Sequence, residues 1–321
     1  MGAVKSLEIL SPGPLTTVQD RGRFGFGAYG VPPSGAMDFF SLRVGNLLVG
    51  NAEDEACLEI TVMGPRAMAL IDTAVAITGA DLQPRINEKP LEMWRSHVLK
   101  KGEVLSFKGL RSGCRAYLAV GGGISVTTIM DSKSTNLAAG FGGLEGRPLR
   151  ARDILFINSP HLHLKTEGLA LAQKSIPVYP ADWTLRVIFG PQDDHFPPKA
   201  REIFLGSPFK VTPQSDRTGI RLAGPHIEAK RGLKGSIISE GVVPGTIQIP
   251  GDAQPIIILG ETVTGGYRKI ATVISADLPL LGQLKPGDRV SFSRVSMDEA
   301  YQAIREMEEV INKFKRKVCT G

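Results

Sequence analysis

Short apolar runs separated by turn residues dominate the hydrophobic pattern of this chain. Residues 4–11 are predicted to form the first strand. Similar runs follow at residues 57–62, 66–70, 75–78, 104–107, 117–120 and 154–157, and later at 185–189, 210–211, 219–222, 236–239, 246–249, 256–259, 271–275 and 289–292. Glycine, proline, asparagine or aspartate separates them. Many short strands with such punctuation predict a mainly β protein built from barrels or sandwiches.

Helical spacing is confined to a few segments. Asp38 is a candidate N-cap for a helix with a broad apolar face, and Gly50 is a good stop for it. A short helix is expected after Pro198, because proline suits the first helical turn. In the last segment, Ser296 and Glu299 have the spacing of a capping box before an amphipathic pattern. A helix is therefore predicted near the C-terminus.

The length of 321 residues exceeds the size at which single cores usually stop growing. Residues 159–180 are more polar than their surroundings and show no sustained period, which is typical of a linker. We therefore expect a first domain at residues 1–160, a linker at 161–181, and a second domain at 182–321 that includes the C-terminal helix.

The two halves share three similar segments in the same order. The pairs are 19–23 with 215–221, 30–35 with 241–246, and 100–107 with 285–292. Each match alone is weak, because a Gly-Asp or Gly-Glu turn before a strand is common. Together they predict a duplicated barrel.

Composition narrows the class of protein. Apolar residues make up 42% and charged residues 22%, as in ordinary globular proteins. The net charge of +6 fits an anionic small substrate. The basic residues are scattered apart from a few near the C-terminus, so no nucleic-acid partner is expected. No apolar run is long enough for a membrane span and no export signal is recognisable, so a cytoplasmic protein is expected.

Cofactor motifs are scarce. The sequence has no P-loop. Cys57, Cys114 and Cys319 are widely spaced, which favours reduced thiols over a disulfide framework or a zinc site. The run Asp193-Asp194-His195 is better explained as a solvated turn or helix cap than as a metal site.

The first candidate for chemistry is the stretch of residues 16–38. It places Asp20, Arg21 and Arg23 among glycines and then passes through Ser34 to Asp38. Glycines allow positive φ and close approach to a ligand, so the stretch could be a shaped binding loop. An ordinary hairpin and connector with solvated charges is the alternative.

The second candidate is the stretch of residues 239–255. It offers Glu240, Gln248, Asp252 and Gln254 in strand-like surroundings. Strand alternation sends Gln248 to the face opposite its isoleucine neighbours. Such amides and carboxylates could fix an amide or carboxylate substrate, whereas the alternative is simple capping of loops.

The third candidate is the stretch of residues 262–269. Gly265 and Gly266 can turn successive N–H groups toward one anion, and Thr264 and Lys269 add donors. A tight hairpin is the alternative.

Several motifs together resemble one family. They are Val18-Gln19-Asp20-Arg21-Gly22-Arg23, Ser34-Gly35-Ala36-Met37-Asp38, Leu48-Val49-Gly50-Asn51, Thr78-Gly79-Ala80-Asp81, Ser239-Glu240-Gly241-Val242-Val243-Pro244-Gly245 and Ser275-Ala276-Asp277-Leu278-Pro279. The chain is similar over residues 10–293 to the KipA/PxpC family, which includes allophanate hydrolase subunit 2-like proteins and the carboxyltransferase domain of urea amidolyase. The segments 130–135, 152–153 and 261–268 depart from the pattern of that family.

This resemblance implies two cyclophilin-like β-barrel domains and a cytoplasmic protein. It also implies a subunit of an ATP-dependent 5-oxoprolinase that converts 5-oxoproline to glutamate with KipI/PxpB-like and PxpA-like partners. One alternative is a component that transfers a carboxyl group to urea or a related amide with biotin. Another is a non-enzymatic antagonist that binds a KipI-like kinase inhibitor.

Opening a lactam needs a cationic clamp, donors for oxyanion charge and a general base near the attacking water. We expect the base to be Asp20, Asp38 or Glu240, and Lys269 to act as an anion donor. The predicted substrate-binding residues are Arg21, Arg23, Ser34, Arg43, Gln248, Asp252, Gln254, Thr264, Gly265, Gly266 and Tyr267. ATP is expected to serve the complex, through this chain or a partner, and no metal site is expected.

Overall fold

The computed structural model describes residues 2–158, 164–233 and 235–320, so residues 161–163 of the predicted linker lie outside the described part. The chain divides into two compact units. Unit 1 comprises Met1–Phe24, Ser34–Tyr179 and Glu308–Gly321, and unit 2 comprises Gly25–Pro33 and Pro180–Met307. The main division falls within the predicted linker. The units differ from the predicted domains in two other places. Residues 25–33 belong to unit 2, and the C-terminal helix from Glu308 onward belongs to unit 1, because the units are defined by packing and not by chain order.

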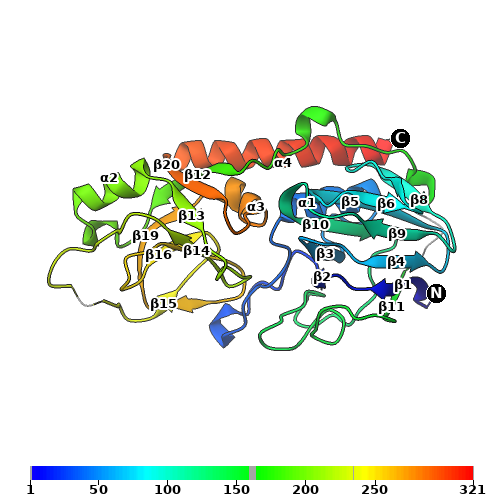
Figure 1. Ribbon diagram of the computed structural model, residues 1–321, viewed down its shortest axis with the longest axis horizontal. Helices are drawn as coiled ribbons and strands as arrows, with labels where there is room; N and C mark the ends of the chain where they lie inside the picture. The colour runs from blue at the N-terminus through cyan, green and yellow to red at the C-terminus, as the bar shows by residue number, and fades with distance from the viewer. Residues whose placement is uncertain (1, 159–163, 234, 321) are drawn as a thin grey trace. The chain divides into compact units, whose positions relative to one another are not determined.

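Unit 1 contains two β-sheets (Figure 1). The six-stranded sheet has the order β11 (Ile154–Ile157), β1 (Val4–Ser11), β4 (Arg66–Ala69), β9 (Val104–Phe107), β6 (Pro84–Ile86) and β7 (Lys89–Pro90). The five-stranded sheet has the order β2 (Leu15–Gln19), β3 (Cys57–Thr61), β10 (Ser112–Val120), β5 (Thr73–Asp81) and β8 (Ser96–Leu99).

The two sheets of unit 1 share one apolar core. Leu7 and Ile9 come from the first sheet, Leu58 and Ile60 come from the second, and all four are fully buried in the same cluster. The mainly β prediction is therefore confirmed, but unit 1 has two sheets where the resemblance implied a closed barrel. A pattern of short apolar runs does not distinguish the two, because both bury alternate residues.

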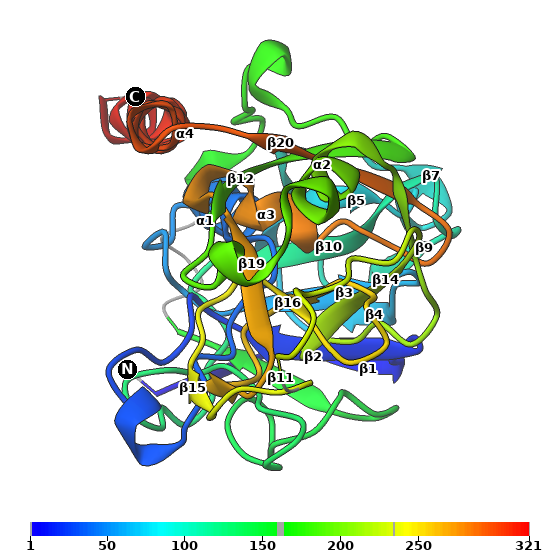
Figure 2. The ribbon, with the colours of Figure 1, turned by 90° about the vertical axis from the view of Figure 1, so that its left-hand side faces the viewer.

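Unit 2 is a closed barrel of seven strands (Figure 2). The strands run in the order β12 (Asp182–Phe189), β19 (Arg268–Val273), β16 (Thr246–Ile249), β17 (Ile256–Ile258), β14 (Gly219–Ala223), β13 (Phe209–Val211) and β20 (Arg289–Arg294). The pair β12–β20 is parallel, which closes the barrel between its first and last strands. A separate ribbon pairs β15 (Glu240–Gly241) with β18 (Thr264–Gly265).

Four α-helices accompany the strands in the described part of the chain. They are α1 (Phe39–Leu48), α2 (Pro198–Gly206), α3 (Leu278–Leu281) and α4 (Met297–Thr320). The predicted caps are present: the Asp38 side chain accepts from the backbone N–H of Ser41, and Ser296 and Glu299 form a reciprocal capping box. No helix of the described residues is both long and apolar enough to cross a bilayer.

Two of the predicted internal repeats have the same local structure in both units. In unit 1 the Glu103 carboxylate accepts from the backbone N–H of Lys100, and in unit 2 the Asp288 carboxylate accepts from that of Lys285. Asp20 and Asp216 each accept a bond from the backbone N–H two residues later. Such side-chain turns depend on short-range sequence, so the repeated residues reproduce the repeated geometry.

An ion-pair network in unit 1 joins α1 to the middle of α4. The Arg43 guanidinium, on α1, donates from Nε to Glu53 at 2.9 Å and from Nη1 and Nη2 to Glu308 at 2.5 and 2.8 Å. Arg43 is only 4% exposed. Each guanidinium nitrogen of Arg43 is thus held by a carboxylate of the same unit, and its role as a substrate clamp stays a prediction.

We predict that Arg43→Met lowers the free energy of unfolding by about 2 kcal/mol. Loss of one member of a buried pair costs about 3–5 kcal/mol, and Glu53 and Glu308 keep part of their hydration because their side chains are 22% and 38% exposed. Urea denaturation at neutral pH measures the change. Lys313→Met, which breaks an exposed pair on α4, is the control and should change stability by less than about 0.5 kcal/mol. Equal effects of the two substitutions would contradict the assignment.

The same network should be sensitive to acid. Its hydrogen bonds with Arg43 hold the pKa of Glu308 below the usual value. A carboxylate with a lowered folded-state pKa contributes stability above its unfolded pKa and loses it as the pH falls through the folded one. The stability difference between the wild type and Arg43→Met should therefore shrink as the pH drops below about 4. A difference that stays constant in acid would rule out this origin of the stability.

Candidate functional site

In unit 1, the Asp20 carboxylate holds the loop of residues 132–134. It accepts hydrogen bonds from the hydroxyls of Ser132 and Ser134 and from the backbone N–H groups of Gly22 and Lys133. Asp20 is 8% exposed. A carboxylate offers about four acceptor positions, and protein donors use that many here. The oxygens of Asp20 therefore organise two loops, and its role as a base stays a prediction.

The neighbouring predicted residues meet the same loop. The Arg23 guanidinium donates to the carbonyl of Ser134 at 2.7 Å and lies over the ring of Phe141, and it is 1% exposed. The hydroxyl of Ser34 accepts from the Asn136 amide at 3.2 Å. Arg21 alone of this predicted set is exposed to solvent. The loop is therefore a buried framework, and Arg21 is its accessible cation.

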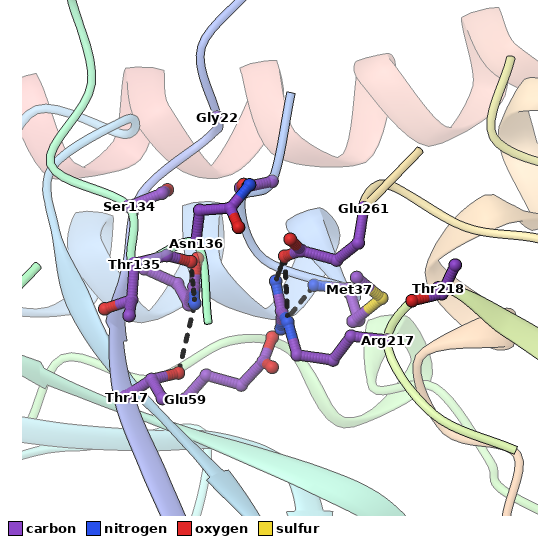
Figure 3. A network of polar contacts seen from close by, with 12 residues as sticks. Thr17, Gly22, Met37, Glu59, Ser134, Thr135, Asn136, Arg217, Thr218 and Glu261 are labelled. Carbon is purple, nitrogen blue, oxygen red and sulfur yellow. Dashed lines mark hydrogen bonds and ion pairs between the residues drawn. The ribbon is translucent and has the colours of Figure 1, made fainter. Parts of the chain in front are cut away.

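A buried glutamine lies beside this framework. Nε2 of Gln19 donates to the hydroxyl of Thr17 and to the carbonyl of Thr135, each at 3.1 Å, and both threonines are visible in Figure 3. Within the described residues, Oε1 of Gln19 is buried without a hydrogen-bond partner. Unit 1 therefore holds one unused acceptor at the end of β2.

Asp38 is likewise occupied by protein contacts. Its carboxylate caps α1 and accepts from the hydroxyl of Ser41 at 2.6 Å, and Asp38 is 1% exposed. Its backbone N–H donates to the hydroxyl of Tyr117, which donates in turn to Glu59 at 2.7 Å. Burial, followed by the charge of Glu59, raises the pKa of Tyr117 well above its usual value, so this phenol stays protonated. Asp38 thus caps a helix in this structure, and its role as a base stays a prediction.

In unit 2, the pairing of β16 with β19 brings two predicted residues together. Gln248 is opposite Lys269, after a register shift next to Ile247. The exposed fractions of Gln248 and Lys269 are 3% and 4%. Strand alternation puts both on one face of the barrel wall, and Ile249 with its partner Arg268 on the other. A cation and an amide thus lie side by side in a site from which water is mostly excluded.

A third predicted residue, Glu240 of β15, completes this group. The Lys269 ammonium donates to Oε1 of Glu240, and Nε2 of Gln192 donates to the same oxygen at 2.8 Å. The hydrogen bond from Lys269 holds the pKa of Glu240 below its usual value. The Glu240 side chain is 46% exposed, so it is an ionised carboxylate open to solvent with a buried cation behind it. We call Glu240, Gln248, Lys269 and Gln192 the Glu240 cluster.

The cluster depends on a glycine in the ribbon. Gly265 of β18 pairs with Glu240, and a Cβ at this position would overlap the amide of Gln248. Nε2 of Gln248 is buried and, among the described residues, has no hydrogen-bond acceptor. Lys269 has three N–H donors, of which Glu240 uses one. The cluster therefore contains unused donors beside an exposed acceptor.

The other predicted residues of unit 2 lie at its surface. Thr264 and Gly266 are part of the ribbon and its extension, where the carbonyl of Gly266 accepts from Ile237 N–H, and Tyr267 is 41% exposed. The Gln254 amide bonds twice to the backbone of Gly224, and Asp252 accepts from the backbone N–H of Gln254. Gln254 and Asp252 thus match the loop-capping alternative.

A buried ion pair occupies a segment that departs from the family pattern. The Arg217 guanidinium donates to Oε1 of Glu261 at 3.0 Å, as Figure 3 shows, and their side chains are 7% and 5% exposed. The acid at position 261 therefore has a partner in its own unit.

Sequence reasoning does not find three of the contributors, which are the two serines of the 132–134 loop and Gln192. Ser132 and Ser134 stand out in the sequence only as part of a departure from a family pattern, and Gln192 lies next to a run that predicts a solvated turn. For Ser132 and Ser134, the available signal is the pair of serines on either side of Lys133. No local signal marks Gln192, because its partner Glu240 lies 48 residues further along the chain. In the described residues, no group of three histidine, cysteine or acidic side chains is arranged to hold a metal ion. The side chain of Cys319 lies outside the described part.

Known proteins resemble this chain over nearly its full length. Urea amidolyase of Lachancea kluyveri is 37% identical over 95% of this chain, which spans 17% of that protein. The C subunit of the 5-oxoprolinase of Escherichia coli strain K12 is 35% identical over 94% of this chain and 95% of its own length. The crystal structure of the K. lactis urea amidolyase matches 98% of this chain and 20% of that chain, with a TM-score of 0.92 and 34% identity.

A family model described as the carboxyltransferase domain, subdomains A and B, matches residues 29–294. The match covers most of both units and contains the whole Glu240 cluster. The chain therefore belongs to this carboxyltransferase-domain family.

Proposed function

We propose that this chain is a subunit of an ATP-dependent 5-oxoprolinase complex that opens 5-oxoproline to glutamate with KipI/PxpB-like and PxpA-like partners. The carrying observation is the 35% identity to the C subunit of the Escherichia coli 5-oxoprolinase, which covers 95% of that protein. The corresponding match to urea amidolyase covers only 17% of that protein. The Glu240 cluster supplies groups that suit amide chemistry.

In this proposal the lactam binds against the Glu240 cluster. A lactam presents a carbonyl oxygen that accepts hydrogen bonds and an N–H that donates one. The amide of Gln248 and the remaining N–H groups of Lys269 are the donors for the carbonyl oxygen, where negative charge develops during attack. The exposed carboxylate of Glu240 takes the role of base toward the attacking water.

Access to the buried donors requires a small displacement of the ribbon. Gly265 covers the Gln248 amide, and each ribbon strand has only two residues. A two-stranded ribbon of this length has little intrinsic stability, so it can move at low cost. ATP, if the complex binds it, would supply the phosphoryl group that activates the amide for attack, while the residues of this chain would position the lactam and take the proton from water.

We predict that Glu240→Gln lowers kcat of the reconstituted complex by about 10²-fold or more, the usual contribution of a general base. The isosteric amide keeps the size of the side chain but cannot take a proton. Turnover of 5-oxoproline with ATP is measured after the three subunits are combined, and assembly is followed by size-exclusion chromatography. Glu309→Gln, which replaces an exposed glutamate of α4, is the matched control and should retain wild-type kcat.

Two results would count against this assignment. If Glu240→Gln loses complex formation together with turnover, the ribbon is a protein contact and the antagonist function gains support. If Glu240→Gln turns over normally, the base lies elsewhere.

We further predict a pH signature for the pair. Lys269 holds the pKa of Glu240 below its usual value, so the base is ionised into the acid range. Lys269→Met removes this effect and raises the pKa of Glu240, so the acid limb of the kcat/KM profile should move to higher pH. Glu240→Gln should have no such limb. An acid limb that Lys269→Met leaves unmoved would show that another group titrates.

Carboxyl transfer to urea or a related amide is the second candidate function. The match to the K. lactis urea amidolyase structure, with a TM-score of 0.92, is the observation that favours it. It requires a biotin carboxylase and a biotinyl carrier from other chains. Incubation with carboxybiotin and urea, in the absence of ATP, distinguishes the two functions. Carboxylated product would favour carboxyl transfer. Its absence, together with turnover of 5-oxoproline, would favour the 5-oxoprolinase function.

A further inference from the structure

A hollow of about 450 Å³ opens at one end of the unit 2 barrel. Its walls are the loop of residues 226–233 and the turn of residues 249–253 after β16, and Arg268 at the start of β19 also lines it. Since Arg268 and Lys269 are consecutive in a strand, the hollow lies on the opposite face of the barrel wall from the Glu240 cluster. It is therefore separate from the proposed reaction site.

Three cationic side chains, two acidic ones and His226 line this hollow. Lys230, Arg231 and Arg268 carry permanent positive charges, whereas Glu228 and Asp252 are the acidic members. Arg268 is 5% exposed, so one guanidinium is fixed in the wall. Lys230 and Arg231 are exposed, and within the described residues neither side chain has an ion-pair partner. Two cations with unused donors thus flank a buried one.

The backbone of the hollow leaves room for a ligand. Gly232, Gly235 and Gly251 line it, and a Cβ added at any of them would meet nothing within 4 Å. The backbone at these positions therefore borders open space, where a ligand can approach closely. The volume lies within the range of small-molecule sites, about 300–1,000 Å³.

We propose that this hollow binds the phosphate chain of a small phosphorylated ligand. Several separated cations match a ligand whose negative charge is spread over many oxygens, and guanidinium groups bind phosphate oxygens in pairs. The ligand class includes a nucleoside triphosphate and an inorganic polyphosphate, which share this chemistry.

The test measures binding by the full chain, without turnover. Tripolyphosphate, ATP and inorganic phosphate are titrated separately by isothermal calorimetry. The variant Lys230→Gln/Arg231→Gln removes the two exposed cations and leaves buried Arg268 in place, so the fold is preserved. We expect tripolyphosphate to bind the wild type and to bind this variant at least about tenfold more weakly, because the variant loses charge-assisted hydrogen bonds from two cations.

A second cationic hollow in unit 1 provides the matched control. Arg66 and Lys108 line it, and Arg66→Gln/Lys108→Gln removes the same number of charges from the chain. This variant should bind tripolyphosphate within about twofold of the wild type. Equal weakening in both variants would show non-specific attraction and overturn the proposal, as would the absence of binding by all three probes at about 1 mM.

Comparison of the three titrations also identifies which kind of phosphorylated ligand the hollow binds. ATP binding more tightly than tripolyphosphate would identify a nucleotide, and equal affinities would identify the phosphate chain alone. Glu240→Gln should bind tripolyphosphate like the wild type, because Glu240 does not line the hollow. Loss of turnover in that variant with intact binding separates the proposed function from this inference.

Discussion

The pairing of β16 with β19 is the constraint on which the chemistry of unit 2 depends. The register shift leaves Ile270 as an extra residue in β19, so that Gln248 is opposite Lys269 and Ile249 is opposite Arg268. Without this bulge, Gln248 would be opposite Ile270, and Lys269 would be opposite Ile249. Bulges commonly re-aim side chains in this way. One irregularity thus places an amide and an ammonium group together on one side of the wall and a guanidinium on the other.

Sequence reasoning succeeded where structure depends on neighbours in the chain. The cap at Asp38 and the capping box at Ser296 follow from bonds across three residues, and alternation along β16 separates Gln248 from its isoleucines. It does not reach contacts whose partner is distant in the chain. Arg43 resembled a ligand clamp because its partner Glu308 lies 265 residues further along the chain.

The candidate site shows the same division. Glu240 and Lys269 can both be selected from the sequence, but as members of different loops, since nothing local indicates that they form an ion pair. Asp20 resembles a base because acids among glycines are typical of binding loops. The structure shows the same residue saturated by hydroxyl and backbone donors, a use that composition cannot separate from catalysis.

The ribbon glycine has a consequence for how this family can diversify. A Cβ at Gly265 would lie 2.1 Å from Nε2 of Gln248, so any side chain at this position would displace the amide or the ribbon. Substitution of this glycine would therefore move or cover the Gln248 amide without changing a charged residue. A homologue that carries alanine at this position would look intact by its polar residues and yet present a different surface to a substrate.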